Sequence, residues 1–288
     1  MPLGDSQFLR CVHRVLFSIV DVKNRGKCTM TTANFVVFGP DHLAVLGLVA
    51  AAASGMIWAK RLNGWPRLVR FQEWILIAVL ILSWPADWLS AYLINTVNWE
   101  TILPLHLCDL ASFAGVVAVI WRHQLAAELA YFWAMAGTLN GLITPAITAS
   151  FPHPIFIAFF MLHGAVVVTA FYLIGGLRLW PRPGAVWRAF AASLVYLTAI
   201  AGINALLGTN FAFVCRKPDT PSLMDAMGPW PWYVLWLIPL GLVLYTVFYF
   251  PFWLAHQRGW TPASQALASR QRHRLLPWPH PKDDHPPQ

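Results

Sequence analysis

The run Thr-Ile-Leu-Pro-Leu-His-Leu-Cys-Asp-Leu-Ala-Ser-Phe-Ala-Gly-Val-Val-Ala-Val-Ile-Trp occupies residues 101–121 and has the length and apolar content of a membrane-spanning helix. Such a span needs about 20 mostly apolar residues. Near its start the run also holds three ionisable residues, His106, Cys108 and Asp109. Ionisable side chains are costly in a bilayer and rarely face lipid. The sequence therefore predicts a polar site inside a bundle of membrane helices.

The composition of the whole chain agrees with a membrane protein. Of its 288 residues, 58% are hydrophobic and 11% are charged, whereas a soluble domain carries roughly 25% charged residues. The net charge of +8 favours anionic lipid headgroups as the surface that the basic residues meet. Nucleic acid is not an expected partner, because the basic residues are dispersed between apolar runs and form no patch.

Seven segments are long and apolar enough to span a membrane. They predict an all-α fold, a polytopic membrane helical bundle of seven transmembrane helices over residues 35–256. Pro85 and Asp87 interrupt the second segment and Pro239 the seventh, which is tolerated where neighbouring helices re-satisfy the backbone. The predicted spans are residues 42–59, 71–94, 101–121, 127–148, 155–177, 187–207 and 230–254.

Lysine and arginine predict the orientation, because cytoplasmic loops are enriched in them. The connections after the first, third and fifth spans and the tail after the seventh hold 13 of these residues, whereas the loops on the other side hold two, Arg216 and Lys217. We therefore expect a multi-pass protein of the inner (plasma) membrane, with the amino end outside and the carboxyl end in the cytoplasm.

Both ends of the chain are predicted to lie outside the bundle. Residues 1–34 form an N-terminal extension, and residues 1–29 carry five basic residues on the outer side, against the charge rule. We hypothesise that translation starts at Met30, so that residues 1–29 are not translated. Residues 257–288 are polar, basic and Pro-rich and predict a disordered cytoplasmic tail.

Most polar residues of the spans are expected in the outer half of the bundle. Cys108 and His163 stand seven and eight residues beyond the outer starts of their spans, or roughly 10–12 Å deep at 1.5 Å per residue. Glu73 and Glu128 lie near inner ends, where we expect interfacial water as their partner. The other polar residues expected in the outer half are Asp87, Asn140, Thr144, Asn204 and Tyr233.

Helical spacing separates the three ionisable residues of the opening run. Asp109 is one residue round from Cys108, whereas His106 lies about 160° away if the helix is regular through Pro104. We therefore expect Cys108 to face the site and His163, on another span, to be its partner. The stripe that falls within about 80° of Cys108 has small and polar members and comprises Thr101, Leu105, Ser112 and Gly115.

A cysteine beside a histidine is an arrangement for nucleophilic catalysis. The thiolate is the reactive form, and the imidazole accepts its proton. Asp109 is the candidate that orients the histidine. The alternative is structural, since a buried cysteine packs as a small apolar residue and a histidine can bond between helices. Candidates for polar support or oxyanion stabilisation are Asn140, Thr144, Asn204, Asn210 and Tyr233.

Two groups of residues could instead bind ligands: one a metal ion, the other a phosphate group. His106, Cys108, Asp109 and His163 are types of residue that bind zinc, but His-x-Cys-Asp is not a ligand spacing, so we expect neither a metal nor another cofactor. Arg216 and Lys217 are predicted to bind a phosphate headgroup through a guanidinium fork and an ammonium charge, with solvated loop charges as the alternative. A disulfide between Cys108 and Cys215 is a minor possibility.

Six motifs together resemble a known family, the YwaF-like bacterial integral membrane proteins, over about residues 35–252. That family is similar to an animal transmembrane acyltransferase that places fatty acyl chains on ether phospholipids. The motifs are Leu-Pro-Leu-His-Leu-Cys-Asp-Leu (103–110), Glu-Leu-Ala-Tyr-Phe-Trp-x-x-Ala-Gly-Thr-Leu (128–139), Phe-Pro-His (151–153), His-Gly (163–164), Asn210 with Cys-Arg-Lys-Pro (215–218), and Gly-Pro-Trp-Pro-Trp-Tyr (228–233).

The resemblance implies an acyl-enzyme on Cys108, with His163 as the base. His106 and His153 stand in matching segments and are the alternative histidines. The resulting hypothesis is an integral membrane acyltransferase, or a lipid acyl hydrolase, that acts on phospholipid acyl chains. Its expected partners are membrane lipids.

Two alternatives come from other classes of protein. A transporter or channel would bind a solute in the polar pocket, but its path needs polar groups in both halves of the bundle, and the inner halves of the middle spans are apolar. A membrane sensor or scaffold would use no chemistry at Cys108. Gly137 and Gly141 form a GxxxG, which we interpret as a site of close helix packing.

Overall fold

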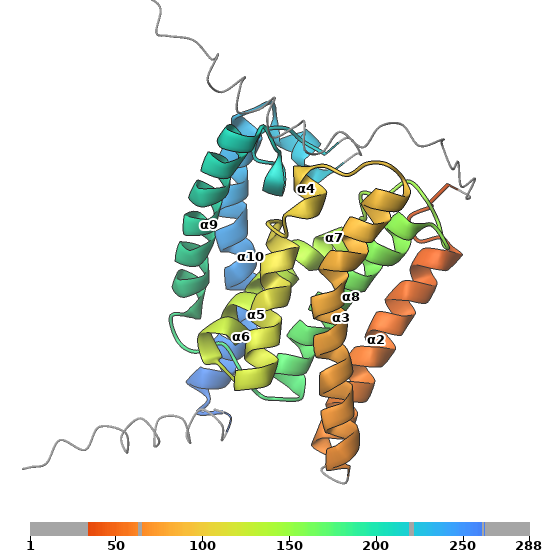
Figure 1. The fold of residues 1–288 in the computed structure, drawn as a ribbon. Helices are drawn as coiled ribbons and strands as arrows, with labels where there is room; N and C mark the ends of the chain where they lie inside the picture. The colour runs from red at the N-terminus through yellow and green to blue at the C-terminus, as the bar shows by residue number, and fades with distance from the viewer. Residues whose placement is uncertain (1–33, 63–64, 219–221, 261, 263–288) are drawn as a thin grey trace, which may run out of the picture.

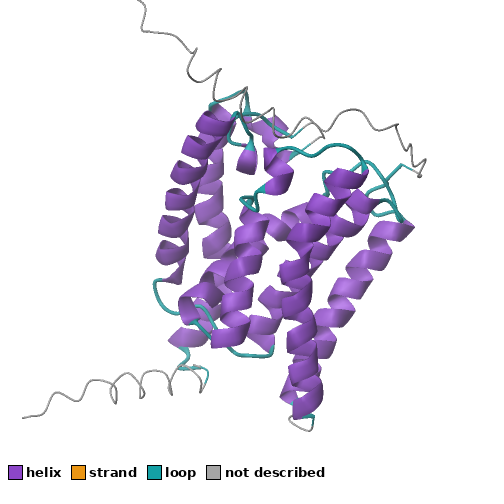
Figure 2. Ribbon diagram, viewed as in Figure 1, coloured by secondary structure: helices purple, strands orange, loops and turns teal. Residues whose placement is uncertain are grey.

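A computed structural model describes residues 34–62, 65–218, 222–260 and 262. Within these residues the regular structure is helical, apart from one isolated bridge between Asn34 and Ala149. The predicted all-α fold is therefore confirmed (Figure 2). The start at Met30, most of the N-terminal extension and the tail from residue 263 lie outside the described residues.

Six stretches of the described chain are long and apolar enough to cross a membrane, and they correspond to six of the predicted spans. They are α2 (Pro40–Arg61), α3 (Pro66–Leu93), α4 with α5 (Trp99–Ile102 and Leu107–Trp121), α8 (Pro154–Gly175), α9 (Ala185–Leu207) and α10 (Trp232–Gln257).

The remaining predicted span is an unbroken helix that changes type in its middle. It consists of α6 (Gln124–Trp133), the π-helix η1 (Ala134–Thr138) and α7 (Leu139–Ile143). It ends five residues before the predicted limit at residue 148, where the chain turns towards α8. Two short 3-10 helices, η2 (Phe211–Phe213) and η3 (Leu223–Met227), lie between α9 and α10.

Proline does not mark the interruptions where the sequence suggested them. α3 continues through Pro85, and α10 continues through Pro239. The break falls instead in the third span, between α4 and α5, at residues 103–106. The helix is therefore not regular through Pro104, the condition on which the predicted angle of His106 depended, and the consequence for His106 is given below.

The helices form a tightly packed part and a looser pair (Figure 1). α8 is central, with 67% of its apolar stretch buried, whereas the figure is 11% for both α9 and α10. The apolar core joins α8 to α3, α5 and α6, with Leu80, Phe132 and Val166 almost completely buried. The exposed apolar faces of α9 and α10 suit contact with lipid.

Two carboxylates, one half-buried and one fully buried, form ion pairs at one end of the bundle. Glu73 on α3 pairs with Arg122 at 2.8 Å and accepts a hydrogen bond from the Tyr172 hydroxyl of α8. Glu128 on α6 is fully buried and pairs with two arginines that are named below. We call this the basic end; α4, η2 and η3 lie at the opposite end (Figure 1). Ion pairs, not the expected interfacial water, thus explain both glutamates.

Candidate functional site

The centre of the candidate site is the non-helical turn between α4 and α5. Two carbonyl groups at this break lack helical partners and are bonded by side chains of other helices. The indole of Trp84 on α3 donates to the Ile102 carbonyl at 2.9 Å, and the Tyr196 hydroxyl of α9 donates to the Leu105 carbonyl at 2.9 Å. Irregular backbone at membrane depth is tolerated where protein groups satisfy it in this way.

His106 and Asp109 together begin α5. His106 is the residue before the first helical turn, and the Asp109 carboxylate accepts a hydrogen bond from the His106 backbone N–H at 3.0 Å. Because His106 lies outside the helix, the predicted angle of 160° does not apply. Its ring packs edge-on against Phe211, with 5.2 Å between ring centroids. The structure thus gives Asp109 a capping contact with backbone, and its role in orienting a histidine stays a prediction.

Cys108 lies in the first turn of α5 and is a half-buried free thiol. Three polar groups lie close enough to Cys108 for electrostatic interaction. They are Asp87 on α3, the adjacent Asp109, and the Tyr196 hydroxyl of α9. Cys215 is also free and is exposed. The two cysteines therefore form no disulfide.

His163 on α8 has a defined ring orientation. Its Nδ1 lies 2.9 Å from the Phe159 carbonyl oxygen, and because a carbonyl only accepts, Nδ1 carries the proton of the neutral ring. Nε2 therefore holds the lone pair. The Phe159 ring stacks on the imidazole at 3.9 Å, and a methyl group at Gly141 would lie 3.2 Å from Nε2. Such a ring is suited to accept a proton at Nε2.

The two glycines of the GxxxG place α5 and α8 against successive turns of one helix. A methyl group at Gly137 would lie 3.3 Å from the Leu107 side chain, next to Cys108, and one at Gly141 would meet His163. These contacts confirm close helix packing at this motif. In the described structure, however, no hydrogen bond joins Cys108 to His163.

The other predicted polar residues mostly bond to backbone. Asn140 donates to the Ala136 carbonyl at 2.7 Å, and Thr144 donates to the Asn140 carbonyl at 2.9 Å. Both bonds lie within their own helix. His153 caps α8, where its Nδ1 accepts from the Ile155 N–H at 3.3 Å. These contacts are structural. Polar support by Asn140 and Thr144, and the role of His153 as an alternative histidine, stay predictions.

Asn204, Asn210 and Tyr233 hold the loop that follows α9. The Asn204 oxygen accepts from the Phe211 N–H at 2.8 Å, and the Asn210 oxygen accepts from the N–H groups of Cys215 and Arg216 at 3.0 Å. The buried Tyr233 hydroxyl donates to the Phe213 carbonyl at 2.7 Å. These bonds hold η2, whose Phe211 ring packs against His106, and a catalytic role for the three residues stays a prediction.

Arg216 and Lys217 lie at the same end of the bundle as the α4–α5 break. Arg216 is 4.0 Å from Glu100, and Lys217 is 3.8 Å from Asp225. The Arg216 side chain is 68% exposed, and exposed ion pairs at such distances contribute little. Arg216 is therefore the more accessible of the two cations, because the Lys217 side chain is 25% exposed and lies over the Tyr233 ring.

Three residues near the site did not stand out in the sequence. Tyr196 bonds the helix break, and His42 is fully buried, accepting from the Phe38 N–H and donating to the Leu142 carbonyl. The Thr138 hydroxyl is buried at the end of the π-helix and has no hydrogen-bond partner in the described structure. π-helical turns are frequent at functional sites. Among the described residues, no three His, Cys, Asp or Glu side chains are grouped to hold a metal ion.

Comparison with known proteins identifies the family. The sequence profile of the TMEM164 family matches residues 37–249, which include every candidate residue from Asp87 to Tyr233. The chain belongs to the TMEM164 family. No curated protein and no solved structure matches it. Membership in this transmembrane family and the apolar helices together make the chain a multi-pass membrane protein. The α4–α5 break and His163 both lie within the part that the TMEM164 profile matches.

Proposed function

We propose that this TMEM164-family protein is a membrane acyltransferase, or a lipid acyl hydrolase, that acts on phospholipid acyl chains. Cys108 is the nucleophile and His163 is the base. The observation that carries the proposal is the orientation of His163, whose Nε2 lone pair lies beside the helix that also contacts Leu107. The resemblance of the motifs around both residues to an acyltransferase-related family supports the same assignment.

The first half of the reaction forms a thioester. His163 Nε2 takes the proton of the Cys108 thiol, and the sulfur attacks the carbonyl carbon of an acyl ester. The resulting tetrahedral oxyanion needs hydrogen-bond donors, for which the buried Thr138 hydroxyl is a candidate because it lacks a partner among the described residues. Collapse breaks the ester C–O bond, and the leaving lysolipid oxygen takes the proton from His163.

The second half releases the acyl chain. His163 takes a proton from an acceptor hydroxyl, which attacks the thioester carbonyl; the C–S bond breaks, and the Cys108 sulfur regains a proton from the imidazole. If water is the acceptor, the product is a fatty acid, so exclusion of water decides between transfer and hydrolysis. In the resting state the two side chains are not hydrogen-bonded, and catalytic bonds commonly tighten only when substrate is bound.

Lipid reaches the site from the leaflet at the α4 end, which the distribution of basic residues predicts to be the outer one. Arg216 and Lys217 lie at that end and supply two cations for a phosphate, with their present partners held at 4.0 and 3.8 Å. The phosphate then stays near the surface while the ester group enters towards Cys108.

The proposal is tested by incubating the purified protein with acyl-bearing phospholipids and measuring its intact mass. We expect an acyl adduct on the wild type and none on Cys108→Ala. His163→Ala should slow formation of the adduct by about a hundredfold or more, since general-base catalysis contributes 10²–10⁴-fold. Cys215→Ser is the matched control, because this free thiol is exposed, and it should retain the adduct.

Two results would contradict the proposal. If no adduct and no lysolipid form with lipids of varied headgroup and chain length, the protein does not use this chemistry, and solute transport becomes the better hypothesis. If lysolipid is released equally by wild type and Cys108→Ala, the nucleophile is wrong. A mutant His106→Ala that loses the adduct while His163→Ala keeps it would move the base to His106.

A further inference from the structure

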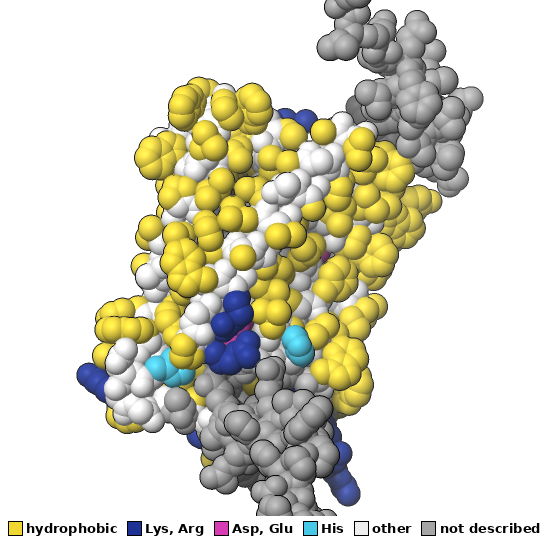
Figure 3. All heavy atoms as spheres, turned by 90° about the vertical axis from the view of Figure 1, so that its left-hand side faces the viewer, with side chains coloured by type: hydrophobic (Ala, Val, Ile, Leu, Met, Phe, Trp, Pro, Cys, Tyr) yellow, Lys and Arg dark blue, Asp and Glu magenta, His cyan; other side chains and the backbone are white. Residues whose placement is uncertain are grey.

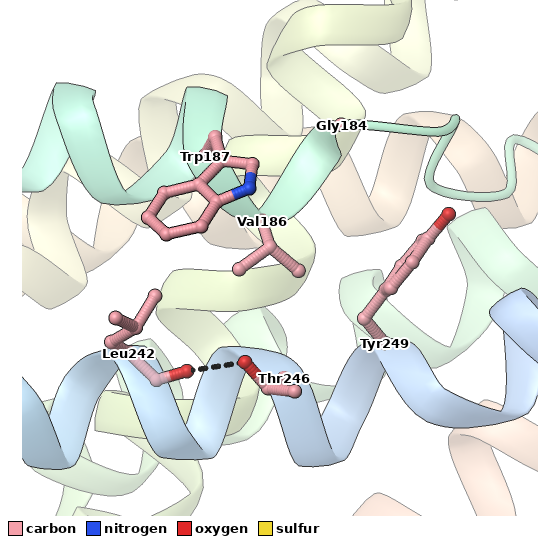
Figure 4. A pocket seen from close by; sticks show the side chains of 6 residues that line it. All are labelled: Gly184, Val186, Trp187, Leu242, Thr246 and Tyr249. Atoms are coloured by element: carbon pink, nitrogen blue, oxygen red, sulfur yellow. Dashed lines mark hydrogen bonds between the residues drawn. The ribbon is translucent and has the colours of Figure 1, made fainter.

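A groove separates α9 from α10 near the basic end, far along α9 from the site around Cys108. Its volume is about 320 Å³, which is at the lower end of the range for small-molecule sites. Figure 4 shows its lining, in which the side chains of α9 and α10 face one another across the gap. The lining residues are Gly184, Val186, Trp187, Leu242, Thr246 and Tyr249.

The middle of the groove is apolar. Val186 and Leu242 face it from opposite helices, and Thr246 adds no free donor because its hydroxyl bonds the Leu242 carbonyl at 2.8 Å (Figure 4). Lined in this way, the groove suits a hydrocarbon chain better than a polar solute. Both helices expose most of their apolar stretch, so a lipid in the bilayer has direct access to it.

Arg188 brings positive charge to one end of the groove. A methyl group at Gly184, a lining residue, would lie 3.2 Å from Arg188 Nη1. Two other nitrogens of this guanidinium bond Glu128 at 2.8 and 2.9 Å, and one hydrogen of Nη1 bonds the Pro183 carbonyl at 3.1 Å. The second Nη1 hydrogen has no partner in the described structure, and Nη1 is the atom that a methyl group at the lining residue Gly184 would meet.

The local charge is positive. Arg182 and Arg188 share the single carboxylate of Glu128, each with a contact of 2.8 Å. Two cations and one anion leave an excess of one positive charge. Glu128 is completely buried, but the arginine side chains are 34% and 36% exposed. Figure 3 shows this face, where basic side chains surround an acidic one below a broad apolar surface.

Two further donors stand at this end of the groove. The Tyr249 hydroxyl is close enough to Arg188 and Glu128 for electrostatic interaction. In Figure 4 it points to the side of the groove where Gly184 lies. The Trp187 indole N–H also lines the groove. Neither group has a hydrogen-bond partner within the described chain. With Nη1 of Arg188 they form a set of donors without an acceptor, at the end of an apolar groove.

We infer that the α9–α10 groove binds one anionic phospholipid from the leaflet at the basic end. One acyl chain lies between Val186 and Leu242, and the phosphate accepts from Arg188 Nη1 and the Tyr249 hydroxyl. Arginine is well suited to phosphate oxygens, and Arg188 keeps its bonds to Glu128. The excess charge predicts preference for a lipid with a net negative headgroup over a zwitterionic one. This site does not depend on the proposed reaction at Cys108.

The test is native mass spectrometry of the purified full-length protein with phosphatidylglycerol or phosphatidylcholine. We expect one retained phosphatidylglycerol and weaker retention of phosphatidylcholine. Thr246→Trp fills the groove from an exposed position and should abolish retention. Tyr249→Phe removes one hydrogen bond and should weaken it by about fivefold. Val247→Trp is the matched control, since Val247 is 57% exposed and does not line the groove; it should retain the lipid.

Several outcomes would overturn the inference. If Thr246→Trp retains as much lipid as the wild type and unfolds at the same temperature, the lipid lies elsewhere. Displacement of the lipid by millimolar glycerol phosphate would show that the headgroup alone is bound and that the acyl chain lies outside the groove. A protein dimer that Thr246→Trp dissociates would show that a second copy, and not a lipid, covers this face.

Discussion

At the scale of single residues, two neighbours fix the imidazole of His163: Nδ1 donates to the Phe159 carbonyl, and the absence of a side chain at Gly141 leaves room for the ring. Neither contact follows from the depth of His163 in its span, so the sequence did not predict the orientation of the ring. The contact between Asp109 and the His106 N–H could have been predicted from the sequence, because an acidic residue three positions after a helix start is a capping pattern.

Gly141→Ala tests whether the position of the imidazole matters. The new methyl group would lie 3.0 Å from Cδ2 and 3.2 Å from Nε2 of His163. The ring cannot shift easily, since Phe159 stacks on its face and holds Nδ1. We expect the rate of acyl-enzyme formation to fall by about tenfold or more, as small misplacements of catalytic groups are costly.

The control for this substitution is Gly202→Ala on α9, where nothing lies within 4 Å of the added methyl group. It should leave the rate unchanged, and the helix propensity of alanine should stabilise the protein slightly. Unchanged rates in both variants, with intact folding, would argue against His163 as the base.

At the scale of elements, six of the predicted spans are helices long and apolar enough to cross a membrane, but hydropathy did not predict where the spans are irregular. The break between α4 and α5 depends on Tyr196, which is 91 residues away along the chain, and on Trp84 of α3. Three prolines carry the local signal of a break: Pro104 lies in the turn between α4 and α5, whereas Pro85 and Pro239 lie inside continuous helices. A proline removes one backbone N–H donor from a helix. Whether the helix then breaks also depends on side chains elsewhere that can bond the freed carbonyl groups.

Tyr196→Phe tests the role of a side chain in holding the break. The change removes the donor to the Leu105 carbonyl and preserves the ring. We expect the free energy of unfolding to fall by about 1–2 kcal/mol, the typical effect of leaving a buried acceptor unpaired. Hydrogen–deuterium exchange of residues 103–106 should become faster.

Thr198→Val is the matched control on α9, because the Thr198 hydroxyl is exposed and bonds only its own helix at Leu194. It should change neither quantity. If Tyr196→Phe also leaves exchange at the break unaltered, the turn is stabilised by packing and not by this hydrogen bond.

At the scale of the whole molecule, the two ends of the bundle have different chemistry. The α4 end carries the thiol, the histidine and a loop held by amide side chains, whereas the basic end is fastened by Glu73 and Glu128. Counting basic residues predicted this asymmetry, but it could not reveal the pairing of Glu128, whose partners are 54 and 60 residues away along the chain.

Glu128→Gln tests how much the basic end contributes to the stability of the fold. The carboxylate is fully buried and accepts from Arg182 and Arg188, so an amide would leave two guanidinium groups facing each other without an anion. Breaking a buried pair destabilises proteins by about 3–5 kcal/mol. Because water reaches both arginines, we expect the free energy of unfolding to fall by on the order of 2–4 kcal/mol, measured by thermal or denaturant unfolding in detergent.

Glu100→Gln is the comparison. The ion pair of Glu100 with Arg216 spans 4.0 Å at an exposed site, so its loss should lower the free energy of unfolding by less than about 1 kcal/mol. Equal stability of the two variants would mean that the junction of α6 with α9 is held by its apolar contacts, and that Glu128 serves to position Arg188 beside the groove.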